Sequence, residues 1–365
     1  MKEGRSVQMV IEEVMKQVET KKDFMAPTSR MEVFIDSMVG GENEIKLGLH
    51  SSGDTVRFGM KQNAHRNLGS LTQIPASYYD KMMSEDPELL VTNLNRWLPR
   101  LNDTRMVRTL EGKARAILSK SYRPLDNADL AKAVLPVVAQ TNLKIQSCEV
   151  TDDRFYLKAT NPAIRAEVKG SKQVGDIVEA GIVVSNSEVG MGAVSIQPLV
   201  FRLVCKNGAI MNDRALRKYH TGKRGSAEIT DVSYELLRDE TKAKLDEAFW
   251  MQVQDLVRAA VDGVLFNEQV KIMEKAAGNL ITGNVEKVVE MTTKKYQLQE
   301  KEGVSILDYL AKGGDLSQWG LANAVTRASQ DIESYDRATD LERMGGKLIE
   351  LPEVEWVQIA NARTV

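Results

Sequence analysis

The stretch TRMVRTLEGKARAILS, residues 104–119, decides the fold prediction for this chain of 365 residues. Two runs of strand-forming residues flank Glu111-Gly112, a pattern that predicts a β-hairpin. With a two-residue loop, Arg108 and Arg115 would face each other across the strand pair, where like charges repel unless an anion lies over them. A longer loop with a bulge would shift the register by one residue and separate the two arginines.

Further elements extend from this hairpin in both directions. Asp126 or Asn127 is expected to cap a helix that runs to about Gln140, and Pro136 is expected to kink this helix or end it early. The other elements follow from the spacing of apolar residues. Strands are expected within 30–75, at 144–150 and 154–159 across Asp152-Asp153, and at 177–184 and 193–205, and helices at 6–22, 76–99, 239–266, 267–278, 283–297, 304–312 and 317–343.

The order of these elements predicts an α+β fold, in which antiparallel hairpins and packed helices form the core and a mainly helical region follows. The expected domains are an N-terminal helix or arm at 1–29, a mixed core at 30–228 and an acidic helical region at 229–365. The N-terminus lacks the pattern of a signal peptide, and no apolar run reaches the ~18 residues of a membrane span. Only two cysteines occur, so we expect a cytoplasmic protein without disulfides.

The net charge of −2 conceals an uneven distribution of charged residues. Residues 96–123 hold eight basic and two acidic side chains, and residues 202–224 hold seven basic and one acidic. Residues 231–365, by contrast, carry 24 acidic and 16 basic side chains. Because the positive charge is concentrated in two windows, an overall acidic chain can still present a surface that attracts polyanions.

The two basic windows supply the candidate site. In the second window Tyr219 and His220 lie among cations, an arrangement typical of proteins whose cations neutralise phosphates while their aromatic rings stack on bases. We therefore expect these windows to bind nucleic acid. The candidate residues are Arg105, Arg108, Lys113, Arg115, Lys120, Arg123, Arg202, Lys206, Arg214, Arg217, Lys218, Tyr219, His220, Lys223 and Arg224.

The sequence shows no motif for catalysis, metal binding or cofactor binding. The three histidines are not spaced as metal ligands, and the phosphate-binding loop and the nucleophile elbow are absent. We therefore expect no catalytic residue, no metal and no cofactor. One alternative stays open, a metal-dependent nuclease that uses carboxylates such as Asp126, Asp129, Asp152 and Asp153.

Three ordered blocks resemble the phage/plasmid-like protein family of unknown function, which is borne by mobile elements. The blocks are RAILSKSYRPLDN at 115–127, SNSEVG at 185–190 and RLVCKNG at 202–208. The resemblance implies an origin in a phage or plasmid, and thus a bacterial host cell, but it implies no activity and no catalytic residues. The order of elements is also similar to that of Rad52-like single-strand annealing proteins, which are rings that bind DNA along a basic groove.

These observations predict a nucleic-acid-binding protein of a phage or plasmid, which binds or anneals single-stranded DNA or assists recombination and which forms homo-oligomers. No membrane partner is expected. The other hypothesis is an interaction module, in which the acidic helical region binds or inhibits a host or phage protein. Binding through the basic windows would weaken steeply as the salt concentration rises, because each neutralised phosphate releases counterions.

Overall fold

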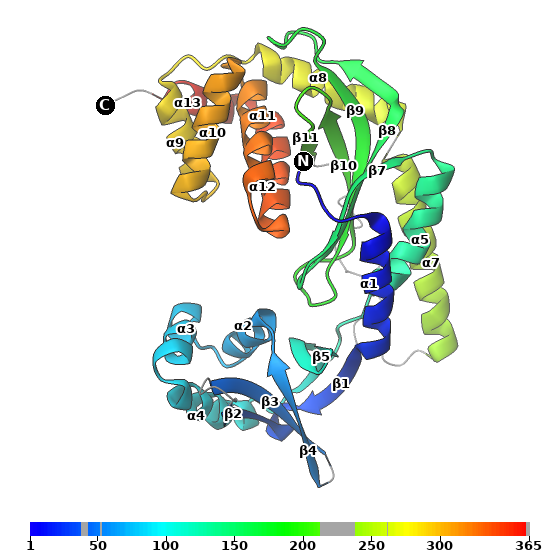
Figure 1. Cartoon of the computed structure of the whole chain (residues 1–365), viewed down its shortest axis with the longest axis vertical. Helices are drawn as coiled ribbons and strands as arrows, with labels where there is room; N and C mark the ends of the chain where they lie inside the picture. Colours follow the sequence, from blue (N-terminus) through cyan, green and yellow to red (C-terminus); the bar gives the residue numbers. More distant parts are fainter. Residues whose placement is uncertain (38–42, 52, 212–237, 261, 363–365) are drawn as a thin grey trace.

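The structure is a computed structural model that describes residues 1–37, 43–51, 53–211, 238–260 and 262–362. Its strands form two separate sheets, and Figure 1 shows them in two units that are connected beside the N-terminal helix α1 (Val7–Thr20). We call residues 22–119 the first unit, and residues 1–21 together with 120–362 the second unit. The predicted α+β fold with a mainly helical C-terminal region is confirmed.

The first unit contains a six-stranded sheet with helices packed against it. The strand order is β1-β5-β6-β4-β3-β2, and all neighbouring strands are antiparallel except β4 and β6, which are parallel. The strands are β1 (Lys22–Pro27), β2 (Met31–Ser37), β3 (Asn43–Ser51), β4 (Asp54–Met60), β5 (Thr104–Leu110) and β6 (Lys113–Ser119). The helices are α2 (Gln62–Leu71), α3 (Ala76–Glu85) and α4 (Pro87–Trp97), with short 3-10 helices η1 (Thr28–Arg30) and η2 (Leu98–Leu101).

The core of the first unit is built from alternate strand positions and one stripe of each helix. Val33, Leu47 and Val107 point from the sheet into this core. Leu68 of α2 and Leu94 of α4 are fully buried against them. This period of two in the strands and of three to four in the helices is what an amphipathic sequence produces when one face is buried.

The predicted hairpin at 104–119 is confirmed as β5 and β6. Glu111 and Gly112 form its turn with φ values of 50° and 75°, as in the primed turns that match the twist of a hairpin. The register shifts beside Arg108, so that Arg108 pairs with Ala116 and Arg115 occupies a β-bulge. The predicted direct opposition of the two arginines is therefore wrong, because a bulge separates them although the loop is short.

The second unit contains a five-stranded antiparallel sheet in the order β11-β10-β9-β8-β7. Helices pack on both sides of it: α5 and α7 lie on one side and α11 and α12 on the other (Figure 1). The strands are β7 (Lys144–Val150), β8 (Phe155–Glu167), β9 (Ile177–Asn186), β10 (Ser195–Arg202) and β11 (Asn207–Ile210). The helices are α5 (Asn127–Gln140), α7 (Asp239–Ala259), α8 (Gly263–Gly278), α9 (Val285–Lys295), α10 (Glu300–Gly313), α11 (Gln318–Ala328), α12 (Tyr335–Ile349) and α13 (Glu353–Ala360), with 3-10 helix η4 (Ser329–Asp331).

Each of the three larger hydrophobic cores lies within one unit, and none extends across the boundary between the units. One core contains residues from the first unit alone. A second joins α1, α5 and α7 to β7–β10, and a third joins β8–β11 to α8–α13. Helix α1 thus belongs to the second unit, and the C-terminal helices share a core with its sheet. The expected domain boundaries after residues 29 and 228 stay a prediction.

Several element predictions need correction. Helix α2 lies in a stretch that was expected to contain strands only. The expected helix at 76–99 is two helices, because Asp86 caps α4 and Pro87 occupies its first turn. The expected helix at 317–343 is likewise divided into α11 and α12, and Ser334 caps the latter. Helix α5 does not end at Pro136 but continues to Gln140.

Candidate nucleic-acid interface and the buried arginine network

Arg108 on β5 is completely buried, although the sequence places it in a basic window. Its Nε donates to Asp23 Oδ1 and its Nη2 donates to Asp126 Oδ1, both at 2.9 Å, and its Nη1 donates to the Glu188 carbonyl oxygen at 2.9 Å. Burial alone would lower the pKa of Arg108, but the hydrogen bonds that Arg108 donates to the two carboxylates outweigh burial and raise it. The guanidinium therefore stays charged and acts as an internal link between three segments.

Asp126 connects the two places where the chain passes between the units. It precedes α5 and binds Arg108 of the first unit, while Lys21, directly before β1, forms an ion pair with its second oxygen. Burial raises the pKa of Asp126, but hydrogen bonds from Lys21 and Arg108 outweigh burial and lower it below the usual value. At neutral pH the ionised carboxylate of Asp126 therefore holds together the two connections between the units.

Arg115 and Glu188 form a second buried ion pair beside the first. Arg115 Nη2 lies 2.5 Å from Glu188 Oε2, and the side chains are 7% and 5% exposed. The other oxygen of Glu188 accepts a hydrogen bond of 2.7 Å from the backbone N–H of Asn127 at the start of α5. Asn186 binds the same helix start through the Leu125 carbonyl oxygen. Residues 115–127 and 185–190, two blocks that were singled out in the sequence, thus meet in one polar network.

A small polar cavity of about 100 Å³ adjoins this pair. Arg115 and Glu188 line it together with Lys61, Asp152 and Asp153. Lys61 Nζ lies 2.8 Å from Asp152 Oδ1, and burial together with nearby Asp336 and Asp152 raises the pKa of Asp153. Positive and negative side chains are mixed here, so the cavity does not concentrate one sign of charge.

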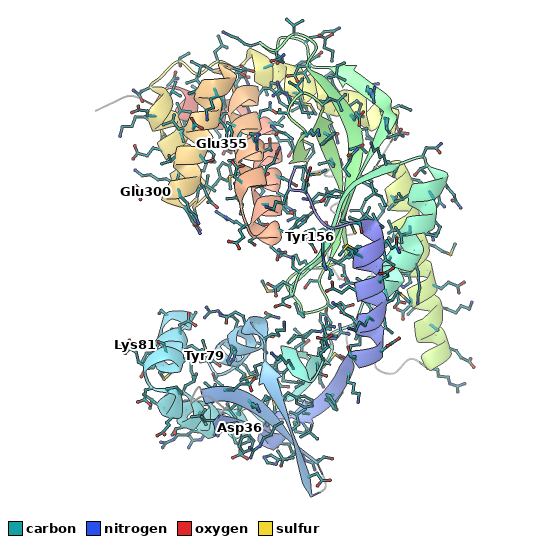
Figure 2. All side chains as sticks on the ribbon, viewed as in Figure 1. Asp36, Tyr79, Lys81, Tyr156, Glu300 and Glu355 are labelled. Carbon is teal, nitrogen blue, oxygen red and sulfur yellow. The ribbon has the colours of Figure 1, made fainter. Side chains whose placement is uncertain are left out.

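The second unit contains a further buried ion pair that the sequence did not indicate. Lys158 Nζ lies 2.7 Å from Glu342 Oε2, and both side chains are fully buried between β8 and α12. Burial lowers the pKa of Lys158 against the opposing effect of Glu342. Tyr156, labelled in Figure 2, donates a hydrogen bond to Asp336 at 2.7 Å near the start of α12. These contacts join the sheet to the C-terminal helices.

The second basic window is described only in part. Arg202 Nε and Nη2 donate to Asp176 at 2.5 and 2.8 Å, and the Trp319 ring N–H donates to the same carboxylate at 3.0 Å. Lys206 is exposed at a turn with φ of 51°. The remaining candidates Arg214, Arg217, Lys218, Tyr219, His220, Lys223 and Arg224 lie outside the described residues.

The other candidates of the first window differ in exposure. Arg123 forms an ion pair with Asp246 of α7, and Arg105 lies 2.6 Å from a carboxylate oxygen of Asp103. Lys113 and Lys120 are exposed and form no ion pair with a described residue. Arg108 and Arg115 therefore do not form an exposed basic face of the hairpin, because Asp23, Asp126 and Glu188 neutralise them.

Sequence reasoning missed an exposed group of arginines around Trp97, which we call the arginine edge: Arg30, Arg96, Trp97 and Arg100. The helical pattern placed Trp97 on the apolar face of its helix, but its side chain is 44% exposed. The Arg100 guanidinium lies over the Trp97 ring, 5.3 Å from its centroid. Arg96 and Arg30 are also exposed, and η1, which holds Arg30, packs against η2.

Within the described residues no group of three or more His, Cys, Asp or Glu side chains is arranged to hold a metal ion. None of the helices in that part of the chain is both long enough and apolar enough to cross a membrane. Both described cysteines are free thiols, Cys148 buried and Cys205 half-buried.

Comparison with known proteins identifies a family but no relative of known activity. No curated protein and no solved structure matches the chain. The profile of a domain of unknown function, DUF932, matches residues 115–343, which is more than half of the chain and begins at the bulged arginine of β6. The chain therefore belongs to the DUF932 family.

Proposed function

We propose that this protein binds single-stranded nucleic acid, DNA in preference, on behalf of a phage or plasmid. The mobile-element origin is supported by the three sequence blocks that resemble the phage/plasmid-like family. The observation that carries the binding proposal is the arginine edge, in which the Arg100 guanidinium lies over an exposed tryptophan and Arg30 and Arg96 are also exposed.

The arginine edge has the two chemical features that sequence-tolerant binding to a single strand requires. A base can stack on Trp97, which is 44% exposed, and such stacking contributes about 1–3 kcal/mol per base. Arg100 already lies over the ring, so its charge is held close to where the phosphate of a stacked nucleotide would lie. Duplex DNA has no unstacked base to offer, and this geometry therefore favours a single strand.

The charges of the arginine edge are free to bind phosphates. Arg30, Arg96 and Arg100 are exposed, and none of them forms an ion pair with a described residue. Arg105 stands nearby on β5, but Asp103 already neutralises it. By contrast, Arg108, Arg115 and Arg202 are bound to internal carboxylates, so we assign them to the fold and not to the binding surface.

A salt titration with an edge variant tests the proposal. A fluorescent 20-nucleotide oligo-dT is titrated with wild-type protein and with R96A/R100A, and the anisotropy is measured over a range of salt concentrations. The variant is expected to bind more weakly, and its log–log salt slope should be smaller by about 1.4, since each phosphate contact on a single strand contributes roughly 0.7. W97A is expected to weaken binding about fivefold or more at fixed salt.

The double variant K271A/K301A is the matched control, because it removes two exposed lysines from the C-terminal helices. It should keep the wild-type affinity and slope. The proposal is refuted if the wild-type protein does not bind the oligonucleotide at low salt. It is also refuted if the edge variant and the control variant lose affinity equally, because general charge attraction then explains the binding. Roles for Lys113, Lys120, Lys206 and the candidates at 214–224, and self-association, stay predictions.

A further inference from the structure

A groove of about 560 Å³ lies between α8 and the segment that joins α12 to α13. Its floor is apolar: Leu265, Ile272 and Ala276 of α8 lie on one side, and Ile349 and Leu351 lie on the other. Binding sites for ligands in proteins typically have volumes of roughly 300–1,000 Å³ and mostly apolar linings. The residues of this groove are distant in sequence from the arginine edge and from the Arg108 network. Neither of those features gives the groove a role.

Helix α8 carries a broad apolar face, and only part of this face packs into the core. Phe266, Val270 and Met273 are buried in the core shared with the sheet. Leu265 and Ile272 instead line the groove, and Ile272 remains 40% exposed. The apolar face is therefore wider than the core covers, and its uncovered edge at Leu265 and Ile272 indicates a further binding partner.

The rim of the groove is acidic. Glu268, Glu350 and Glu353 line it, and Lys275 is the basic residue beside them. Lys275 Nζ lies 3.1 Å from Glu353 Oε2, but both side chains are about two-thirds exposed, and such surface pairs are weak. The pair can therefore open, and the two glutamates Glu268 and Glu353 outnumber Lys275 on the rim.

We infer that this groove binds an amphipathic helical segment of a partner protein, with its apolar side chains on the floor and its lysines or arginines against the glutamates. The acidic rim repels nucleic acid and anionic lipid, so neither matches the groove. A second copy of the chain also matches poorly, because α1, whose apolar side chains are partly exposed, contains three glutamates and one lysine. The inference does not depend on nucleic-acid binding.

A designed peptide tests this inference on the full-length protein. The probe is a fluorescein-labelled 16-residue peptide of leucine and lysine with leucines at helical spacing, and its anisotropy reports binding. An isomer of the same composition with scrambled order is the first comparison. The amphipathic peptide is expected to bind at least about tenfold more tightly than the isomer, since only it presents an apolar stripe.

Two variants assign the binding to the groove. I272Q should weaken binding of the amphipathic peptide about tenfold, and E268Q/E353Q should weaken it and reduce its salt dependence. V304Q, which changes a valine of α10 that is 65% exposed, is the matched control and should leave affinity unchanged. Ile272 is partly exposed, so thermal unfolding of I272Q should match the wild type.

Each of three results would overturn the inference. The first is equal binding of the scrambled isomer, which indicates attraction by charge alone. The second is wild-type affinity in I272Q, which places the peptide elsewhere. The third is self-association of the wild-type protein that I272Q abolishes, measured by analytical ultracentrifugation, because the groove would then hold a second copy of the chain.

Discussion

A guanidinium group without exposed surface needs acceptors in the directions of its N–H bonds. Arg108 binds three, from residues that are 85, 18 and 80 positions away in the sequence. Charged hydrogen bonds of this kind are stronger than neutral ones, and loss of the carboxylates would leave the fully buried guanidinium as an uncompensated charge. Arg108 therefore fixes the positions of Asp23, Asp126 and the Glu188 backbone relative to one another.

Replacement of Arg108 by alanine should destabilise the protein strongly. Because Asp23 and Asp126 would lose their shared cation, the free energy of unfolding is expected to fall by about 3–5 kcal/mol. Urea denaturation followed by circular dichroism measures this change. K113A removes an exposed cation of the same hairpin and should change stability by no more than about 0.5 kcal/mol. Similar unfolding midpoints for the two variants would show that the network does not stabilise the fold.

At the residue scale the sequence could give charge but not exposure. Arg108 and Lys113 look equivalent in the sequence, since both lie in the same basic window. Their environments differ because Asp23 and the 185–190 segment reach Arg108 through the tertiary fold. The sequence also did not predict the exposure of Trp97, because a tryptophan at helical spacing usually packs against the core.

The hairpin turn shows how an element tolerates an unsuitable residue. Glu111 adopts φ of 50°, in the left-handed region where a side chain is normally unfavourable by about 1–2 kcal/mol. Asn-Gly is the preferred sequence for such a turn. The element forms despite Glu111 because β5 and β6 lie inside a sheet and are paired on both sides.

Replacement of Glu111 by asparagine should therefore stabilise the protein, by up to about 1 kcal/mol. The unfolding midpoint in urea gives the comparison with the wild type. E167N serves as the control, because Glu167 is an exposed glutamate at the end of β8 with an ordinary φ. A lower midpoint for E111N than for the wild type would mean that the glutamate makes a favourable contact that outweighs its backbone strain.

At the element scale, periodic patterns predicted most hairpins and helices but misplaced their breaks. Helix α2 was missed because its sequence is mostly polar, and only Ala64, Leu68 and Leu71 supply apolar side chains to the core. The break before α4 had a local signal, an aspartate cap followed by Pro87, which apolar spacing alone overlooks. The bulge at Arg115 has no such signal, because it depends on the position of Glu188 in the other unit.

On the scale of the whole molecule, stability is divided among cores that do not follow the sequence order. The core of the first unit is self-contained. The sheet of the second unit depends on the C-terminal helices, since Val178, Val200 and Met211 share a core with Trp319 and Leu341. The sequence could indicate these helices but not which sheet they cover, because that contact joins residues more than 100 positions apart.

A chain that ends at residue 237 should therefore lose the second sheet while it keeps the first unit. Removal of α7–α13 exposes the apolar side of β9–β11 to water, which a sheet of this size cannot offset. Limited proteolysis with mass spectrometry should show cleavage within 144–211 and protection within 22–119. Wild-type protection of 144–211 in the shortened chain would contradict this division.

The chain passes between the units twice, once from α1 to β1 and once from β6 to α5. The first unit is therefore an insertion, attached by two covalent connections that Lys21 and Asp126 draw to one place. Two connections restrict rotation of one unit against the other, and bending at this place would separate Arg108 from Asp126 and Arg115 from Glu188. We therefore expect these charged hydrogen bonds to oppose changes in the angle between the units.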